Sequence, residues 1–136
     1  MARNAFPYRV TAMQNAELYR RGIVLPLDCD AEVSLRSNNV SETTNVRLLK
    51  IIGAEGFEAL WRLGLFQEIN ARCATLLDDY EEEMIDPASV EVLLTIVDSI
   101  SRAAVAQHPD VVEFLEGLRD LAQQASTLSR PLLFVL

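Results

Sequence analysis

The sequence has little of the side-chain chemistry on which most enzymes and metal sites depend. Its 136 residues include one histidine, His108, and two cysteines, Cys29 and Cys73. Any Ser-His-Asp or Cys-His catalytic arrangement would have to use His108, and the neighbouring sequence offers only Asp110 to orient it. We therefore expect His108 to be a structural residue at a helix junction, and we predict no catalytic residue.

Metal-ligand spacing is also absent from the sequence. Cys29 and Cys73 form no Cys-x-x-Cys pair. The sequence does not decide whether the two cysteines form a disulfide, although two free thiols in a reducing cytosol are the simpler interpretation. Glu55, Glu58 and Glu68 lack the Glu-x-x-His partners of a ferritin-like di-metal site. We predict that the protein needs neither a metal ion nor a cofactor.

Lysine is almost missing, because eleven of the twelve basic residues are arginine and the single lysine is Lys50. We attribute this bias to a GC-rich bacterial genome. Asp and Glu together number 20, and the formal net charge is −8. This charge argues against nucleic acid, whose binding requires clustered cations, and against anionic membrane surfaces. A basic protein partner is compatible with it.

Long apolar runs are absent as well. No stretch approaches the roughly 20 apolar residues of a transmembrane helix, and residues 1–7 lack the apolar core of a signal peptide. We therefore expect a cytoplasmic protein. Hydrophobic residues make up 50% of the chain and charged residues 24%, which is typical of a globular protein. The length suits a single globular domain over residues 1–136.

The pattern that is present is mainly helical. Apolar residues recur at spacings of three and four and predict three main helices, near residues 57–84, 88–107 and 110–129. Asp86 and Pro87 are typical of an N-cap and of the first helical position. Short connections marked by proline should pack these helices antiparallel.

The first third of the chain has a mixed pattern. A short helix is predicted over residues 11–21. Ile23–Leu27 is a predicted strand, and Pro26 favours a place at a sheet edge. Residues 32–36 alternate between polar and apolar side chains, which predicts a half-exposed second strand.

From Ser41 onward the spacing predicts a further helix that ends at Gly53. Gly53, Gly56 and Gly64 then indicate a bend or a break. Residues 132–136 are all apolar, and we expect them to dock on the fold as a strand. The predicted fold is mainly α, of the α+β class. It is an antiparallel bundle of three to five helices with a small β element from the N-terminal third and the C-terminal tail.

Asp28, Asp30 and Glu32 place carboxylates at alternate positions on either side of Cys29. On a strand they would share one face, and such a face could bind a hard cation. The EF-hand pattern is absent, because Val33 stands where that loop requires glycine. We therefore expect a polar turn between two strands.

The densest cluster of like charge is the acidic segment, residues 78–83. It contains five carboxylates and no cation: Asp78, Asp79, Glu81, Glu82 and Glu83. The segment follows a predicted helix, where carboxylates oppose the helix dipole. Like charges this close repel one another unless water or a basic partner screens them. We predict that these five residues bind a partner, and a solvated helix end is the alternative.

The leading hypothesis is a non-catalytic protein-interaction domain that occludes a basic protein partner. An immunity-type inhibitor of a basic toxin is its most concrete version, and a regulatory subunit belongs to the same class. The alternative is a small enzyme or ligand-binding domain with a site assembled from scattered residues. Phe57, Trp61 and Phe66 are assigned to the core, although their spacing is equally compatible with an aromatic ligand pocket.

Overall fold

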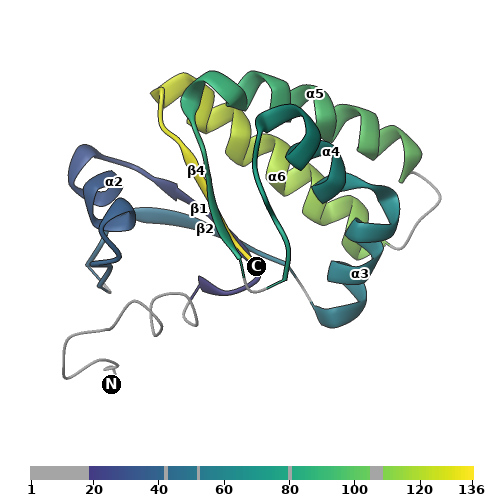
Figure 1. The fold of residues 1–136 in the computed structure, drawn as a ribbon, viewed down its shortest axis with the longest axis horizontal. Helices are drawn as coiled ribbons and strands as arrows, with labels where there is room; N and C mark the ends of the chain where they lie inside the picture. Colours follow the sequence, from purple (N-terminus) through teal and green to yellow (C-terminus); the bar gives the residue numbers. More distant parts are fainter. Residues whose placement is uncertain (1–18, 42, 52, 80, 105–108) are drawn as a thin grey trace.

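The computed structural model describes residues 19–136, apart from residues 42, 52, 80 and 105–108. The described elements are five helices and four strands (Figure 1). In chain order they are β1 (Gly22–Pro26), α2 (Cys29–Arg36), β2 (Val46–Lys50), α3 (Gly53–Leu63), α4 (Leu65–Cys73), β3 (Glu82–Ile85), α5 (Pro87–Ala103), α6 (Pro109–Leu128) and β4 (Leu132–Val135). The prediction of a mixed fold rich in helix is confirmed at this level.

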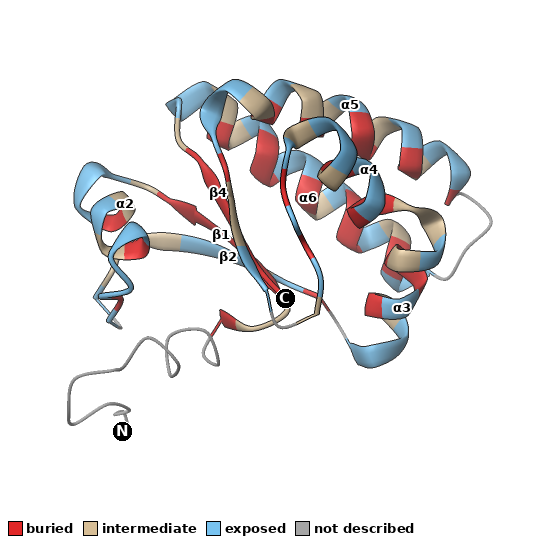
Figure 2. Ribbon diagram, in the orientation of Figure 1, coloured by how far each residue is buried: buried red, intermediate tan, exposed pale blue. Residues whose placement is uncertain are grey.

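The four strands form one sheet in the order β2-β1-β4-β3, and every neighbouring pair is antiparallel. The inner strands β1 and β4 are buried at every residue, whereas the edge strands β2 and β3 are partly exposed (Figure 2). Strands covered on both faces need apolar side chains at every position, which explains the continuous apolar runs of β1 and β4.

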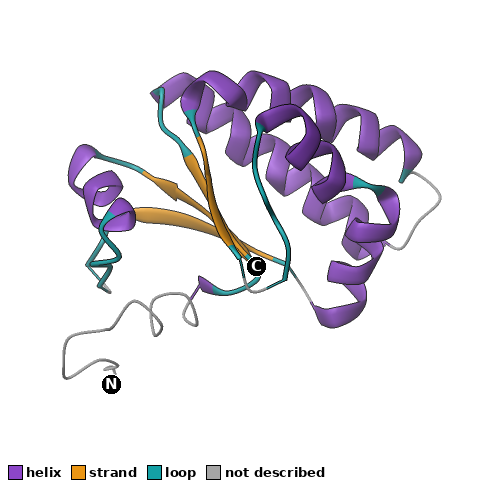
Figure 3. Cartoon of the chain, in the orientation of Figure 1, coloured by secondary structure: helices purple, strands orange, loops and turns teal. Residues whose placement is uncertain are grey.

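Helices cover both faces of the sheet, but unequally. Helices α3, α4, α5 and α6 lie on one side, and α2 lies on the other (Figure 3). Ile23 and Phe134 belong to the large core beneath the four helices. Val24 and Val135 belong to a smaller core that includes Leu35 of α2. Successive residues of a strand point to opposite faces, so β1 and β4 supply both cores.

The strand predicted over residues 32–36 is wrong, because these residues belong to α2. Asp28 is the N-cap of this helix, and its Oδ1 accepts a hydrogen bond from the Ala31 N–H (2.7 Å). Asp30 and Glu32 lie in the first helical turn, where the helix dipole favours negative charge. The three carboxylates therefore stabilise a helix start and do not share the face of a strand.

Two further predictions for the first half of the chain are wrong. The helix predicted from Ser41 to Gly53 is absent, because Val46–Lys50 form β2 and pair with β1. β1 is an inner strand, although Pro26 favours an edge. Its pairing with β4 ends at Val24, so Pro26 lies beyond the stretch that β4 contacts. Residues 11–18 of the predicted first helix lie outside the described residues.

The single helix predicted over residues 57–84 is also wrong. Gly64 adopts a left-handed conformation (φ 88°) and separates α3 from α4, which confirms the predicted break. Ala74, also left-handed (φ 57°), ends α4. The chain then forms a loop and enters β3, so the apolar spacing beyond Cys73 is not helical.

The later predictions are confirmed within the described residues. α5 begins with Asp86 as N-cap and Pro87 in its first turn, and α6 covers most of the third predicted helix. Leu132–Val135 form a strand, but it occupies the centre of the sheet and not a peripheral position. The sheet is therefore central to the fold, and α3 to α6 form a layer upon it (Figure 1).

Candidate functional site

The acidic segment is not a helix end. Asp78, Asp79 and Glu81 lie in the connection between α4 and β3, and Glu82 and Glu83 are the first residues of β3. The helix dipole therefore has no bearing on these carboxylates. Their positions follow from a loop and from the alternating faces of a strand.

Asp79 is held by two arginines from the N-terminal part of the chain. Its Oδ1 accepts from Arg20 Nη2 at 2.5 Å, and its Oδ2 accepts from Arg21 Nη2 at 3.3 Å. Both arginines directly precede β1, so this contact joins the acidic segment to the start of the sheet. No local pattern in the sequence predicts this contact, because Arg20 and Arg21 are 59 and 58 residues away from Asp79.

Two other carboxylates of the segment accept hydrogen bonds from nearby backbone. Glu83 Oε1 accepts from the N–H of Leu76 at 2.9 Å. Asp78 Oδ1 accepts from the N–H of Asp79 at 2.8 Å. Glu83 is paired in register with Phe134 and so lies on the sheet face that the four helices cover.

Negative charge remains uncompensated on the outside of the segment. Asp78, Glu81 and Glu82 are exposed, and no arginine or lysine of the described part of the chain forms an ion pair with them. Partial burial of the Glu82 carboxyl group raises its pKa above the usual value, because lost hydration disfavours the charged form. A cation beside Glu82 would relieve this effect.

The loop before the acidic segment is held rigidly by Asn70. The Asn70 side chain donates to the Leu77 carbonyl (2.9 Å) and accepts from the Leu77 N–H (2.6 Å) and the Thr75 hydroxyl (2.8 Å). Leu77 is buried, but its neighbour Leu76 is 78% exposed. In a helix over residues 57–84, as the spacing predicts, Leu76 would belong to the apolar face. It is instead a large apolar side chain in solvent, and its backbone is fixed by Glu83.

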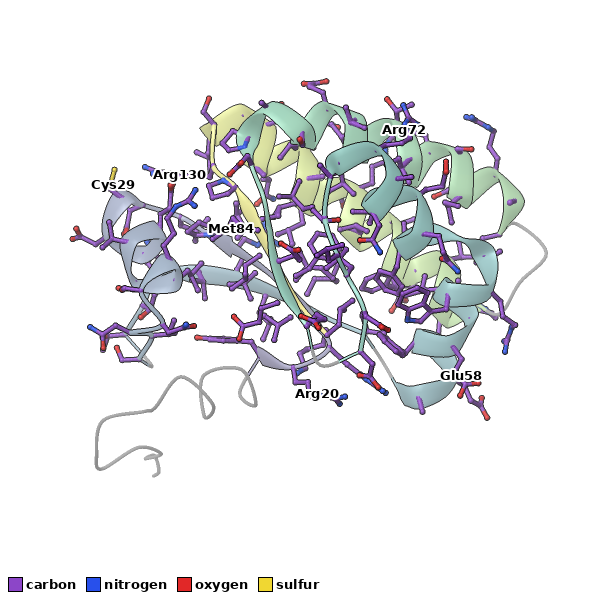
Figure 4. The ribbon with its side chains drawn as sticks, in the orientation of Figure 1. Arg20, Cys29, Glu58, Arg72, Met84 and Arg130 are labelled. Carbon is purple, nitrogen blue, oxygen red and sulfur yellow. The ribbon has the colours of Figure 1, made fainter. Side chains whose placement is uncertain are left out.

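The outer edge of β3 carries backbone groups that pair with no described strand. The Leu136 N–H donates to the Glu81 carbonyl (2.8 Å), so the backbone groups of Glu81 face β4. In an antiparallel ladder this direction alternates, so the N–H and C=O groups of Glu82 and Met84 point away from β4. No described strand pairs with them there. Figure 4 shows the Met84 side chain on the α2 side of the sheet.

A second candidate site lies beside Asp79. It is an open cavity of about 370 Å³. The Arg21 guanidinium lies over the Phe57 ring, 4.1 Å from its centre, and Trp61 packs against Phe66 with ring centres 4.9 Å apart. The lining residues are Arg21, Ala54, Phe57, Glu58, Trp61, Arg62 and Asp79.

The described lining of this cavity combines aromatic and charged side chains. No Ser, Thr, Cys or His side chain is among the lining residues that the structure describes. Arg62 and Glu58 are both 71% exposed and form only a long ion pair (3.9 Å). Their charges remain accessible to a ligand lying against Trp61.

The other residues singled out from the sequence do not form a site in the described structure. Cys29 and Cys73 are free thiols, and burial raises the pKa of the Cys73 thiol. Arg130 contacts Glu32 Oε1 (3.1 Å) and Cys29 Sγ (3.5 Å), so α2 is tied to the start of β4 (Figure 4). His108 lies outside the described residues. Elsewhere, no group of three or more His, Cys, Asp or Glu residues is placed to hold a metal ion, as far as the structure describes the chain.

None of the helices described is both long enough and apolar enough to cross a membrane. Comparison of the chain with protein-family models, with curated proteins and with solved structures found no match. The acidic segment and the aromatic cavity therefore have to be interpreted from their own geometry.

Proposed function

We propose that this protein is a non-catalytic interaction domain whose acidic segment binds a basic protein partner, as an immunity-type inhibitor or a regulatory subunit would. The observation that carries the proposal is the group of exposed carboxylates on Asp78, Glu81 and Glu82, which form no ion pair with a described residue and lie next to the exposed Leu76. An apolar contact surrounded by charged residues is typical of protein interfaces.

The five carboxylates have different parts in this proposal. Asp79 and Glu83 already accept hydrogen bonds and hold the loop in place. Asp78, Glu81 and Glu82 carry the charge that a partner would meet. An acidic patch accelerates the approach of a basic partner, and salt weakens this steering.

The test compares two variants with the same change in net charge. In the first, Asp78→Asn, Glu81→Gln and Glu82→Gln neutralise the three exposed carboxylates of the acidic segment. In the second, Glu113→Gln, Glu116→Gln and Asp120→Asn neutralise three exposed carboxylates of α6. Wild-type and variant proteins are immobilised and exposed to cell extract. Each protein that the wild type retains is purified, and its association rate is measured at 50 and 500 mM salt, concentrations chosen to bracket physiological screening.

The expected result is a basic partner whose association slows by about tenfold with the first variant and stays unchanged with the second. The rate for the wild type should fall with salt, and the first variant should flatten that dependence. Equal rates for both variants would refute the proposal. So would a set of retained proteins that contains no basic protein.

The aromatic cavity favours a second candidate function, the binding of a small anionic aromatic ligand. Trp61 is the only tryptophan in the chain, so its fluorescence reports directly on this cavity. Benzoate and phenylacetate are suitable probes, because each combines an aromatic ring with a carboxylate and neither contains the fluorescent indole of Trp61. Saturable quenching that Arg62→Gln weakens would support a ligand site. No saturable change at millimolar concentrations would exclude these ligands.

A further inference from the structure

We propose that the basic partner is recognised by strand addition. An extended segment of the partner, with alternating cationic and apolar side chains, pairs with the outer edge of β3. This inference rests on the proposed function and adds to it the geometry of binding and the sequence pattern of the partner.

The backbone of β3 supplies the first argument. Glu82 and Met84 each direct one N–H and one C=O group away from β4, and no described strand pairs with them. An edge strand of this kind is a template for a further strand. Main-chain hydrogen bonds then provide affinity, and alternate side chains provide specificity.

The two faces of β3 determine which side chains the added strand carries. Glu82 is paired with Val135 and so lies on the α2 face, where a cation in the added strand would meet a carboxylate that forms no ion pair with any described residue. Leu76 is fixed by Glu83 on the opposite face, where an apolar side chain would cover it. The segment should therefore alternate Lys or Arg with Val, Ile or Leu.

The other edge of the same sheet should not bind this segment. The Leu27 N–H donates to the Asn45 carbonyl (2.9 Å), so by alternation the backbone groups of Leu48 and Lys50 point outward from β2. β2 also carries Arg47 and Lys50, whose charges repel a basic strand. Lysine on an edge strand is a common protection against unwanted pairing. β2 thus serves as an internal control.

A second copy of this chain is the main competing occupant, because its basic β2 could pair with the acidic β3. Such a contact is heterologous, and repeating it would extend the sheet from molecule to molecule without closure. A separate basic partner terminates the sheet after one added strand. In the experiment below, a second copy would protect β2 and β3 together, without peptide, as protein concentration rises.

The test uses the full chain labelled with ¹⁵N and a synthetic peptide, acetyl-KVKVKVK-amide. Hydrogen exchange is followed at each backbone amide by nuclear magnetic resonance. A peptide of identical composition in blocks, acetyl-KKKKVVV-amide, is the control for charge alone. When the alternating peptide is present at ten times its Kd, exchange at Glu82 and Met84 should slow by about tenfold. Exchange at Leu48 and Lys50 should not change.

Methylation of the peptide backbone makes the test specific for strand pairing. In an antiparallel pair, directly opposed residues share a face, and those at hydrogen-bonded positions exchange their hydrogen bonds. For an added strand antiparallel to β3, the peptide lysines on the α2 face are therefore the residues whose N–H groups point to β3. N-methylation of the lysines should abolish protection, whereas N-methylation of the valines should leave it intact. Equal behaviour of the two methylated peptides would contradict strand addition.

Side-chain variants test the two faces separately. Glu82→Gln and Leu76→Ser should each weaken the binding of the alternating peptide by about three- to tenfold, as expected for the loss of a single polar or apolar contact at an interface. Leu128→Ser is the matched control, because Leu128 is also an exposed leucine but lies at the end of α6. Weakening by Leu128→Ser to the same degree would show that Leu76 has no particular role.

The outcomes separate the two proposals. If both the alternating and the block peptide shift the resonances of the acidic segment but neither protects Glu82 and Met84, strand addition is wrong and charge attraction remains. If neither peptide binds at low salt, both proposals fail. If raising the protein concentration without peptide slows exchange at Glu82 and Met84, the outer edge of β3 binds a second copy of the chain. That result overturns the inference.

Discussion

Gly22 and Gly56 show how strongly the effect of one methyl group depends on its surroundings. A Cβ on Gly22 would lie 2.9 Å from the Tyr19 carbonyl oxygen and 2.9 Å from Leu48 Cδ1. A Cβ on Gly56, inside α3, would meet no atom within 4 Å. Gly22 is therefore required where β1 begins, whereas Gly56 only adds flexibility to the unfolded chain.

Substituting alanine at the two glycines should change stability in opposite directions. Gly22→Ala should destabilise the protein by about 1–3 kcal/mol, because the neighbouring carbonyl belongs to the backbone and must shift. Gly56→Ala should stabilise it by about 0.5–1 kcal/mol, since alanine favours a helix interior. Urea unfolding of both variants measures the difference. A stable Gly22→Ala protein would mean that the start of β1 can move freely.

Glu82 gives a pH-dependent prediction at the same scale. Burial raises its pKa in the folded protein above the ordinary 4.5. The folded state therefore holds the proton to higher pH than the unfolded chain, and stability falls as pH rises from 4.5 through the folded pKa. Glu82→Gln should remove this loss of stability at neutral pH. The gain at pH 7 should be below about 1 kcal/mol, because solvent screens a half-exposed carboxylate.

Unfolding curves at pH 7 and pH 3.5 test the sign of this effect, since pH 3.5 is about one unit below the unfolded pKa. The variant should be more stable than the wild type at pH 7 and equal to it at pH 3.5. A gain for Glu82→Gln that persists at pH 3.5 would rule out titration of this carboxyl group.

At the scale of elements, helices with local sequence signals could be predicted, whereas the pairing of strands could not. α5 and α6 carry their start signals and apolar faces within a few residues, so the sequence indicated both. β2 and β3 are short edge strands defined by β1 and β4, their partners elsewhere in the chain. No local periodicity reveals such partners, which is why β2 was predicted to be helical.

The candidate site likewise has features that the sequence predicts and features that depend on tertiary contacts. The five carboxylates of the acidic segment are visible in the sequence as a run of like charge. The contact of Asp79 with Arg20 and Arg21 depends on how the sheet brings distant segments together. The exposure of Leu76 depends on where α4 ends, and a left-handed alanine sets that end. A non-glycine residue in this conformation is uncommon and is hard to anticipate.

The loop between α4 and β3 depends on a single side chain. Asn70→Ala should destabilise the protein by about 1–3 kcal/mol, because it leaves the backbone groups of Leu77 without their partner in a half-buried position. Asn39→Ala is the control, because Asn39 is exposed in the connection between α2 and β2. Urea unfolding gives both values. Equal stability of the two variants would show that the loop holds its shape without Asn70.

At the scale of the whole molecule, β4 joins the two halves of the sheet. It pairs with β1 on one side and with β3 on the other, and its residues contribute to both cores. Leu132–Val135 and Leu136 are buried almost completely. The sheet thus depends on a strand that follows the last helix, and β4 separates β1 from β3 in the order of the described sheet.

Changes in β4 should therefore affect the entire fold. Phe134→Ala should destabilise the protein by about 3–5 kcal/mol, the usual range for a fully buried phenylalanine. Deletion of residues 132–136 should abolish cooperative unfolding, because β3 loses its only described strand partner. Leu76→Ala is the control: the exposed leucine should change stability by less than about 0.5 kcal/mol. Calorimetry distinguishes two descriptions of the molecule. A truncated protein with a sharp thermal transition would mean that the helices form a stable bundle by themselves; a broad or absent transition is expected if the sheet and the helical layer fold as one unit.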